Sequence, residues 1–356
     1  MARYSYQSVL ILFQLAISTR MALLNMSCPK RRYKGSEFTL VINVLPIKFI
    51  LQNTIMYSIA TLNREYLFIL QNNKSICMPH YITIQDAVSQ IKQLIETAII
   101  EGGCEAKNNL IRTSIPINLL HDAVKADLIS KGVNPLLIKP TYGQHAGEVG
   151  VAGYFKAKNQ DVCVLPNHRQ RNPEILRFDG ILSGTRCNLG QSYTEAILSI
   201  NVRSQLSSVA KNFDTLYERT FAESLNLHLR CPSMVLGEFY MIPVYSYDDA
   251  LANQKRVGFR PNRSVKSHIE KYLKSFGAIN NRTTVTGEEY KYERVCLLIV
   301  DFNQDIPKIY NTDEELRQDG LLPLNSTASI NQMNFPSFVD RLLEVYQQRF
   351  GEGRFI

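Results

Sequence analysis

Apolar residues first adopt a helical period near residue 83. They recur every three or four positions through 84–99, with Thr83 before them as a candidate N-cap and Gly102-Gly103 after them as a stop. Apolar residues at that spacing lie on one face of an α-helix. A second run with the same period covers 116–130. The pattern therefore predicts two consecutive amphipathic helices.

The period then changes to that of β-strands. Alternating and continuous apolar runs predict strands at 149–157, 161–165, 175–182 and 194–203. A helical stripe predicts a long helix at 207–228. The rest of the chain predicts strands at 233–245 and 294–302, and helices at 264–277 and 336–350. Strands interleaved with helices predict an α/β (α+β) fold.

The first 80 residues carry a less regular pattern. An apolar run at 9–17 is similar to the central segment of a signal peptide, but it contains Gln14 and is too short to cross a bilayer. We interpret residues 1–80 as a poorly defined N-terminal extension or as the product of a misassigned start. We treat residues 81–356 as one domain.

Charge and motifs narrow the classes of function. The formal net charge of +8 favours a polyanionic partner, nucleic acid first and an anionic membrane surface second. The seven cysteines form no C-x-x-C pair, and the six histidines form no H-E-x-x-H motif, which argues against disulfide frameworks and zinc hydrolases. P-loop, dinucleotide-binding and G-x-S-x-G signatures are also absent from the sequence.

The segment 174–205 is interpreted as a β-hairpin with one apolar and one polar face. Side chains alternate between the faces of a strand, so Asp179 on the first arm is expected near Ser199 and Asn201 on the second, with Arg203 on the same face. An acid, an amide and a cation on one face suit metal-assisted phosphodiester hydrolysis. The plain alternative is a half-solvated hairpin with a polar outer face.

A family resemblance supports the first interpretation. The run INVRSQ at 200–205 is similar to the E-x-K-S-Q stretch of several type II restriction endonucleases, and the following helix resembles theirs. The order helix, three strands, helix, strand resembles the αβββαβ core of the PD-(D/E)xK nucleases. The resemblance covers about residues 175–245. It implies a restriction-endonuclease-like core with added helices and strands.

The resemblance also implies a function. The expected activity is Mg²⁺-dependent, sequence-specific hydrolysis of double-stranded DNA by a cytoplasmic homodimer, with a cognate DNA methyltransferase as functional partner and no membrane association. Asp179 stands at the metal-binding aspartate, Asn201 at the acidic position and Arg203 at the lysine. Replacing Asp179 with alanine is then expected to abolish cleavage and to leave DNA binding largely intact.

Two positions depart from the family pattern. Asn201 brings no charge to a metal site, and Arg203 cannot release a proton as lysine does. A carboxylate supplied from the next helix would compensate, and Glu218 is the candidate by spacing. Asp161, at the start of a strand, is a rival or additional metal ligand, and Glu148 is a further candidate. The alternative function is a catalytically inactive, nuclease-like DNA-binding protein.

Two basic segments are candidates for contacts to DNA. Lys and Arg side chains bind phosphates, and Arg also pairs with base edges. The candidate DNA-binding residues are Arg169, Arg171, Arg256, Arg260, Arg263 and Lys266. The competing interpretation is that these residues lie on solvated loops. A third class of function, an exported or membrane-surface protein, depends on the apolar N-terminal run and the basic charge.

Overall fold

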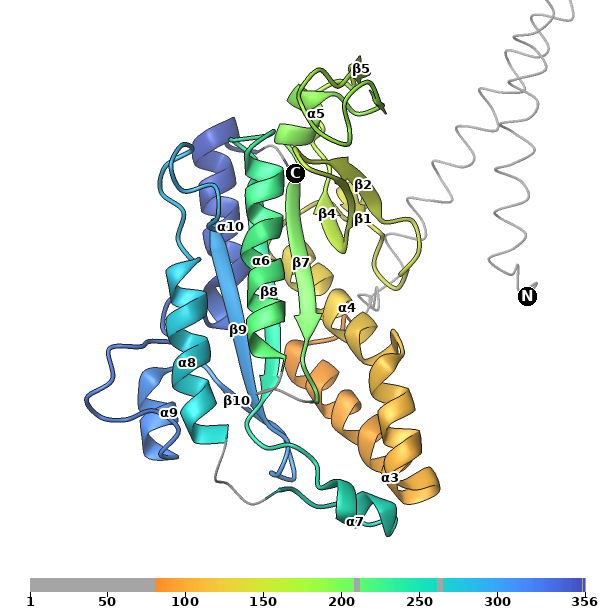
Figure 1. Ribbon diagram of the computed structural model, residues 1–356, viewed down its shortest axis with the longest axis vertical. Helices are drawn as coiled ribbons and strands as arrows, with labels where there is room; N and C mark the ends of the chain where they lie inside the picture. Colours follow the sequence, from red (N-terminus) through yellow and green to blue (C-terminus); the bar gives the residue numbers. More distant parts are fainter. Residues whose placement is uncertain (1–80, 208–211, 261–264, 354, 356) are drawn as a thin grey trace, which may run out of the picture. The chain divides into compact units, whose positions relative to one another are not determined.

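The computed structural model describes residues 81–207, 212–260, 265–353 and 355. The interpretation of residues 1–80 therefore lies outside the described residues. The described segments form a mixed α/β structure with eight α-helices, a six-stranded mixed sheet and two two-stranded ribbons (Figure 1). None of these helices combines the length and apolarity needed to span a bilayer.

The two predicted N-terminal helices are present. Helix α3 (Ile84–Arg112) begins with a capping box, in which Thr83 Oγ1 accepts from the backbone N–H of Asp86 and the Asp86 carboxylate accepts from that of Thr83. The predicted stop was wrong, because Gly103, at φ 72°, kinks the helix without ending it. Helix α4 (Ile115–Ser130) follows and packs against α3.

The central sheet has the order β1-β4-β7-β8-β9-β10. Strands β7, β8 and β9 are mutually parallel, and the outer pairings are antiparallel. Helices α6 and α8 make the crossovers that parallel neighbours require. The bounds are β1 (Ile138–Lys139), β4 (Val162–Val164), β7 (Leu198–Ser204), α6 (Phe213–His228), β8 (Val235–Pro243), α8 (Val265–Ala278), β9 (Arg294–Asp301) and β10 (Lys308–Tyr310).

Helices cover both faces of this sheet. One apolar core joins α3, α4 and α10 (Phe335–Phe350) to Ile200, Val202 and the matching residues of β8 and β9. A second core joins the other face to α6 and α8. Because side chains alternate along β7, Asn201 and Arg203 belong to the face that α6 covers. The remaining helices are a 3₁₀ turn (Pro135–Leu137), α7 (Asp249–Asn253) and α9 (Asp313–Gln318).

The predicted hairpin at 174–205 was wrong. Residues Glu174–Ile175 (β5) pair with Arg186–Cys187 (β6), and the helix α5 (Gln191–Glu195) precedes β7. Gly180 and Gly184 take positive φ values of 133° and 76°, which interrupt the predicted first arm. Strand β7 pairs with β4 and β8 instead, and its first five residues are buried. Its polar face is therefore enclosed.

A second ribbon replaces the strand predicted at 149–157. Strand β2 (Val149–Ala152) pairs antiparallel with β3 (Ala157–Gln160), and the chain turns at 153–156. The buried side chain of Asn226, in α6, binds this turn. Its Oδ1 accepts from the N–H groups of Phe155 (2.7 Å) and Lys156 (3.1 Å). Gly153 is needed here, because a Cβ atom would lie 2.3 Å from Asn226 Nδ2. The ribbon is thus fixed to α6.

Candidate functional site

A cluster of charged side chains lies between β7 and α6. Arg203 donates to Glu238 Oε1 of β8 at 2.5 Å and to Glu223 Oε2 of α6 at 2.5 Å. It also donates to Thr220 Oγ1 at 2.9 Å. Lys158 of β3 forms an ion pair with Glu223. We call Asp161, Glu223, Glu238, Arg203 and Lys158 the carboxylate–cation cluster.

Asp161 joins the cluster from the start of β4. Its Oδ2 accepts from the backbone N–H of Val202 at 2.8 Å. The pairing of Val162 with Ile200 and of Asn201 with Glu238 brings Asp161, Asn201 and Glu238 to one level of three adjacent strands. Burial raises the pKa of Asp161, while the Val202 N–H and the Arg203 charge oppose that rise.

Glu238 is the most perturbed acid of the cluster. It lies in the middle of a strand that is buried throughout, and its side chain is 0% exposed. Burial raises its pKa to about 8; the charge of Arg203 opposes this, and the charges of Glu223 and Asp161 add to it. Three carboxylates face two cations, so the cluster carries one net negative charge when all five groups are ionised. A proton on Glu238 or an added cation would balance that charge.

Within the carboxylate–cation cluster, two buried carboxylate oxygens have no hydrogen-bond partner among the described residues. They are Glu223 Oε1 and Glu238 Oε2. No three His, Cys, Asp or Glu side chains in the described ranges converge as a closed metal cage. Mg²⁺, however, is usually held by one or two carboxylates and keeps several waters. The unpartnered oxygens of Glu223 and Glu238 supply that number of carboxylate ligands.

Solvent reaches the cluster from the side of its cations. The side chains of Lys158 and Arg203 are 34% and 21% exposed, whereas that of Glu223 is 3% exposed. A polyanion approaching this side would therefore meet positive charge first. The carboxylates of Glu223 and Glu238 are more deeply buried than the two cations.

The structure brings together some of the predicted site residues and separates others. Asp161, Asn201 and Arg203 meet in the cluster region. Asp179 is exposed in the turn between β5 and β6, because the hairpin that would have placed it does not form. Glu218 lies on the exposed face of α6. Glu148 is exposed before β2, but it lies close enough to Asp161 for its charge to raise the pKa of that carboxyl group.

The predicted DNA-contacting residues lie at opposite ends of the sheet. Arg169 and Arg171 are exposed in the loop after β4, and Arg171 lies over the Tyr193 ring at 5.3 Å. Arg256 and Arg260 are exposed beyond β8, where Arg260 pairs with Asp249. Strand β4 ends opposite Leu198, the first residue of β7, whereas β8 ends beyond the level of Ser204, the last residue of β7. The two groups of arginines therefore lie at opposite ends of β7. Lys266 belongs to the first turn of α8, and Arg263 lies outside the described residues.

Three residues of the cluster were not predicted. Glu238 had a signal, since a single carboxylate inside an apolar strand must be paired or protonated when buried. Glu223 lies three positions after Thr220 and four before Leu227, which is the spacing of one helix face. Lys158 had no signal in the sequence, because the turn that returns β3 to α6 depends on Asn226.

Comparison with protein-family models, with curated proteins and with solved structures finds no match to this chain.

Proposed function

We propose that this protein is a divalent-metal-dependent deoxyribonuclease, specifically a type II restriction endonuclease with a PD-(D/E)xK-like core. The observation that carries the proposal is a group of three acids between β7 and α6: Glu223 and Glu238 both accept from Arg203, and Asp161 accepts from the adjacent Val202 N–H. Buried acids with unpartnered oxygens beside exposed cations suit the hydrolysis of a phosphodiester.

The order of elements also supports this proposal. Helix α4 is followed by the antiparallel succession β1, β4 and β7, and then by α6 and the parallel strand β8. That order corresponds to the αβββαβ core of the nucleases named above. Asn201 and Arg203 then occupy the second and third signature positions, and Asp161 replaces Asp179 at the first.

Four groups of the cluster have a chemical role in this proposal, and Asp161 holds the first signature position. Mg²⁺ bound through Glu223 and Glu238 would polarise the phosphate and activate a water molecule. Arg203 holds both acids in place and remains charged, because Glu238 and Glu223 raise the pKa of its guanidinium against the effect of burial. Lys158 is the more exposed cation and can release a proton, which Arg203 cannot. Lys158 therefore takes the role of proton donor toward the leaving oxygen.

Cleavage of unmethylated phage DNA tests the proposal. The purified chain should give discrete fragments with Mg²⁺ and none with EDTA. Asp161→Asn and Glu223→Gln should abolish cleavage, whereas the matched exposed variants Asp179→Asn and Glu218→Gln should retain it. Intact DNA with every divalent metal, or equal activity of Asp161→Asn and Asp179→Asn, would contradict the proposed site.

A second candidate is a nuclease-like protein that binds DNA without cutting it. One observation favours this second function. Arg203 donates to one oxygen of Glu223 and to one oxygen of Glu238, so it already balances their charge as a permanently bound cation would. A gel shift of duplex DNA without cleavage in Mg²⁺ or Mn²⁺ would support this function. Discrete fragments would exclude it.

The proposed partners follow from the proposed activity. We expect a homodimer on a palindromic duplex, because a two-fold site is matched by a two-fold protein. A cognate methyltransferase would protect host DNA in the cytoplasm. Light scattering of the chain with and without its DNA site, and cleavage of methylated against unmethylated sites, would test these expectations.

A further inference from the structure

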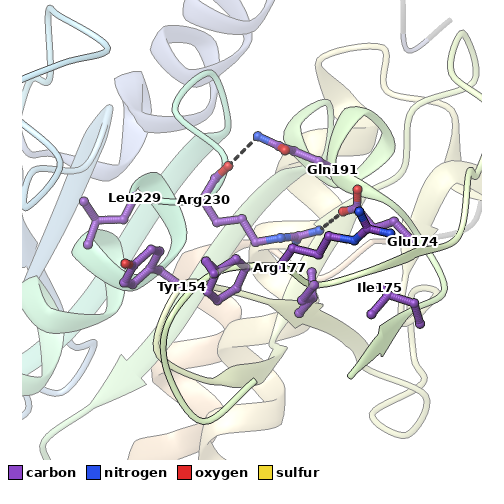
Figure 2. A pocket seen from close by; sticks show the side chains of 9 residues that line it. Tyr154, Glu174, Ile175, Arg177, Gln191, Leu229 and Arg230 are labelled. Atoms are coloured by element: carbon purple, nitrogen blue, oxygen red, sulfur yellow. Dashed lines mark hydrogen bonds and ion pairs between the residues drawn. The ribbon is translucent and has the colours of Figure 1, made fainter. Parts of the chain in front are cut away.

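A pocket of about 640 Å³ lies beside the C-terminal end of α6 (Figure 2). The turn between β2 and β3 contributes Tyr154, and the segment around β5 contributes Glu174, Arg177 and Phe178. Gln191 of α5 and Arg230 complete the polar part of its lining. The pocket is formed by segments distant in sequence, and it is of the size that accommodates small organic ligands.

The polar groups of the pocket favour an anion. The Arg230 guanidinium is shared between Glu174 Oε1 at 2.6 Å and the Ala152 carbonyl at 2.7 Å. Arg177 is exposed and forms no ion pair or hydrogen bond with any described residue. Two guanidinium groups therefore face one carboxylate, and Arg177 keeps its donors for a ligand. Guanidinium donors bind phosphate in a paired geometry.

The other groups favour a ligand with a planar, hydrogen-bonding part. Tyr154 and Phe178 are stacked, with ring centroids 5.0 Å apart and an interplanar angle of 14°. Gln191 donates its amide N–H to the Arg230 carbonyl at 2.8 Å, which leaves its own carbonyl oxygen as an acceptor (Figure 2). Aromatic side chains and amides are the groups that bind nucleobases.

The pocket and the carboxylate–cation cluster are connected by two elements. Arg230 follows Glu223 by seven residues, which is about 10 Å along a helix. Tyr154 precedes Lys158 by four residues, which is at most about 13 Å because the chain turns at 153–156. Asn226 fixes the two elements to each other between these points. The pocket thus lies within a few nucleotides of the cluster.

We infer that this pocket binds one unpaired deoxynucleotide, with its phosphate at Arg177 and its base against the Tyr154–Phe178 pair. The claim that this nucleotide belongs to the DNA strand cut at the cluster rests on the proposed function. The nucleotide-binding chemistry itself depends only on the lining of the pocket.

Isothermal titration calorimetry of the full chain in EDTA tests the inference. The probes are deoxyadenosine 5′-monophosphate and thymidine 5′-monophosphate, compared with inorganic phosphate and with deoxyadenosine. We expect saturable binding of the nucleotides and weaker binding of either part alone. Arg177→Ala should weaken nucleotide binding about tenfold or more, since it removes a charge-assisted hydrogen bond.

Arg186→Ala is the matched control, because Arg186 is an exposed cation of the same ribbon outside the pocket lining. It should leave nucleotide binding unchanged, and Phe178→Leu should weaken it. No saturable binding, equal affinity for inorganic phosphate and nucleotide, or equal losses in the two arginine variants would overturn the inference. Nucleotide binding without DNA cleavage would refute the proposed function alone, and cleavage without nucleotide binding would refute the pocket alone.

Discussion

Replacing Glu238 with glutamine should change how stability depends on pH. Its pKa is about 8 in the folded protein, against an ordinary value of 4.5. Between those values the folded chain holds a proton that the unfolded chain has lost, so stability falls as the pH rises from 4.5 to 8. Each unit of pKa difference corresponds to about 1.4 kcal/mol, so this one group accounts for about 5 kcal/mol across that range.

Urea unfolding in EDTA at a series of pH values measures this effect. The wild-type free energy of unfolding should fall relative to that of Glu238→Gln by about 1.4 kcal/mol per pH unit from roughly pH 5 to pH 8. Above pH 8 the two curves should run parallel. The amide is isosteric and carries no proton that titrates in this range, so the comparison isolates the carboxyl group.

Glu218→Gln is the control for the loss of one negative charge on the chain, because Glu218 is exposed on α6. It should reproduce the wild-type pH dependence. If the wild-type and Glu238→Gln curves stay parallel from pH 5 to 8, Glu238 is ionised throughout and the balance of charge assigned to the cluster is wrong.

The other predictions concern the supports of the site. Asn226→Ala should lower the free energy of unfolding by about 2–4 kcal/mol, because it removes three hydrogen bonds to the turn at 153–156. Asn226→Asp, which keeps the two acceptor bonds and loses only the donor bond, should lose less in the same denaturation assay. Gly237→Ala should destabilise by about 1–3 kcal/mol, because its Cβ would lie 2.8 Å from Leu342 Cδ1; Gly277→Ala, with open space around it, should show no such loss. Burial lowers the pKa of His121 to about 4, so the unfolded chain takes up a proton at a higher pH than the folded chain does. The free energy of unfolding should therefore fall by about 3 kcal/mol from pH 6.5 to 4, and an equal fall in His121→Gln would contradict this. Mg²⁺ should bind more tightly as the pH rises through 8 and should release a proton, which calorimetry in buffers of different ionisation enthalpy would detect.

Much of the fold was predictable because its elements bury one face or both. The apolar stripe after Thr83 and the run of β8, apolar apart from Gly237 and Glu238, each indicate their own secondary structure. The pairing of strands was not predictable in the same way. Alternation along 194–203 identifies two faces of a strand, but it does not identify the neighbouring strand or the helix that covers the polar face.

The candidate site was predictable only where its residues lie on one strand. Asn201 and Arg203 are two positions apart, so any strand places them on one face. Asp161 required the correct partner for that strand, and the incorrect hairpin favoured Asp179 instead. Lys158 required a turn that depends on hydrogen bonds to Asn226. The periodicity of apolar residues therefore could not predict the contacts between segments that are distant in the sequence.

The attachment of the β2–β3 ribbon has a consequence for dynamics. The ribbon forms its own two-stranded sheet, held in place by bonds to Asn226 and Arg230 and by the buried side chain of Val151, so its local opening should need less free energy than global unfolding. An opening of that kind would withdraw Tyr154 and Lys158 together. A ligand that binds only the docked ribbon would raise the population of molecules with Lys158 on Glu223. Slower amide hydrogen exchange at Phe155 and Lys156 would be the signature of that coupling.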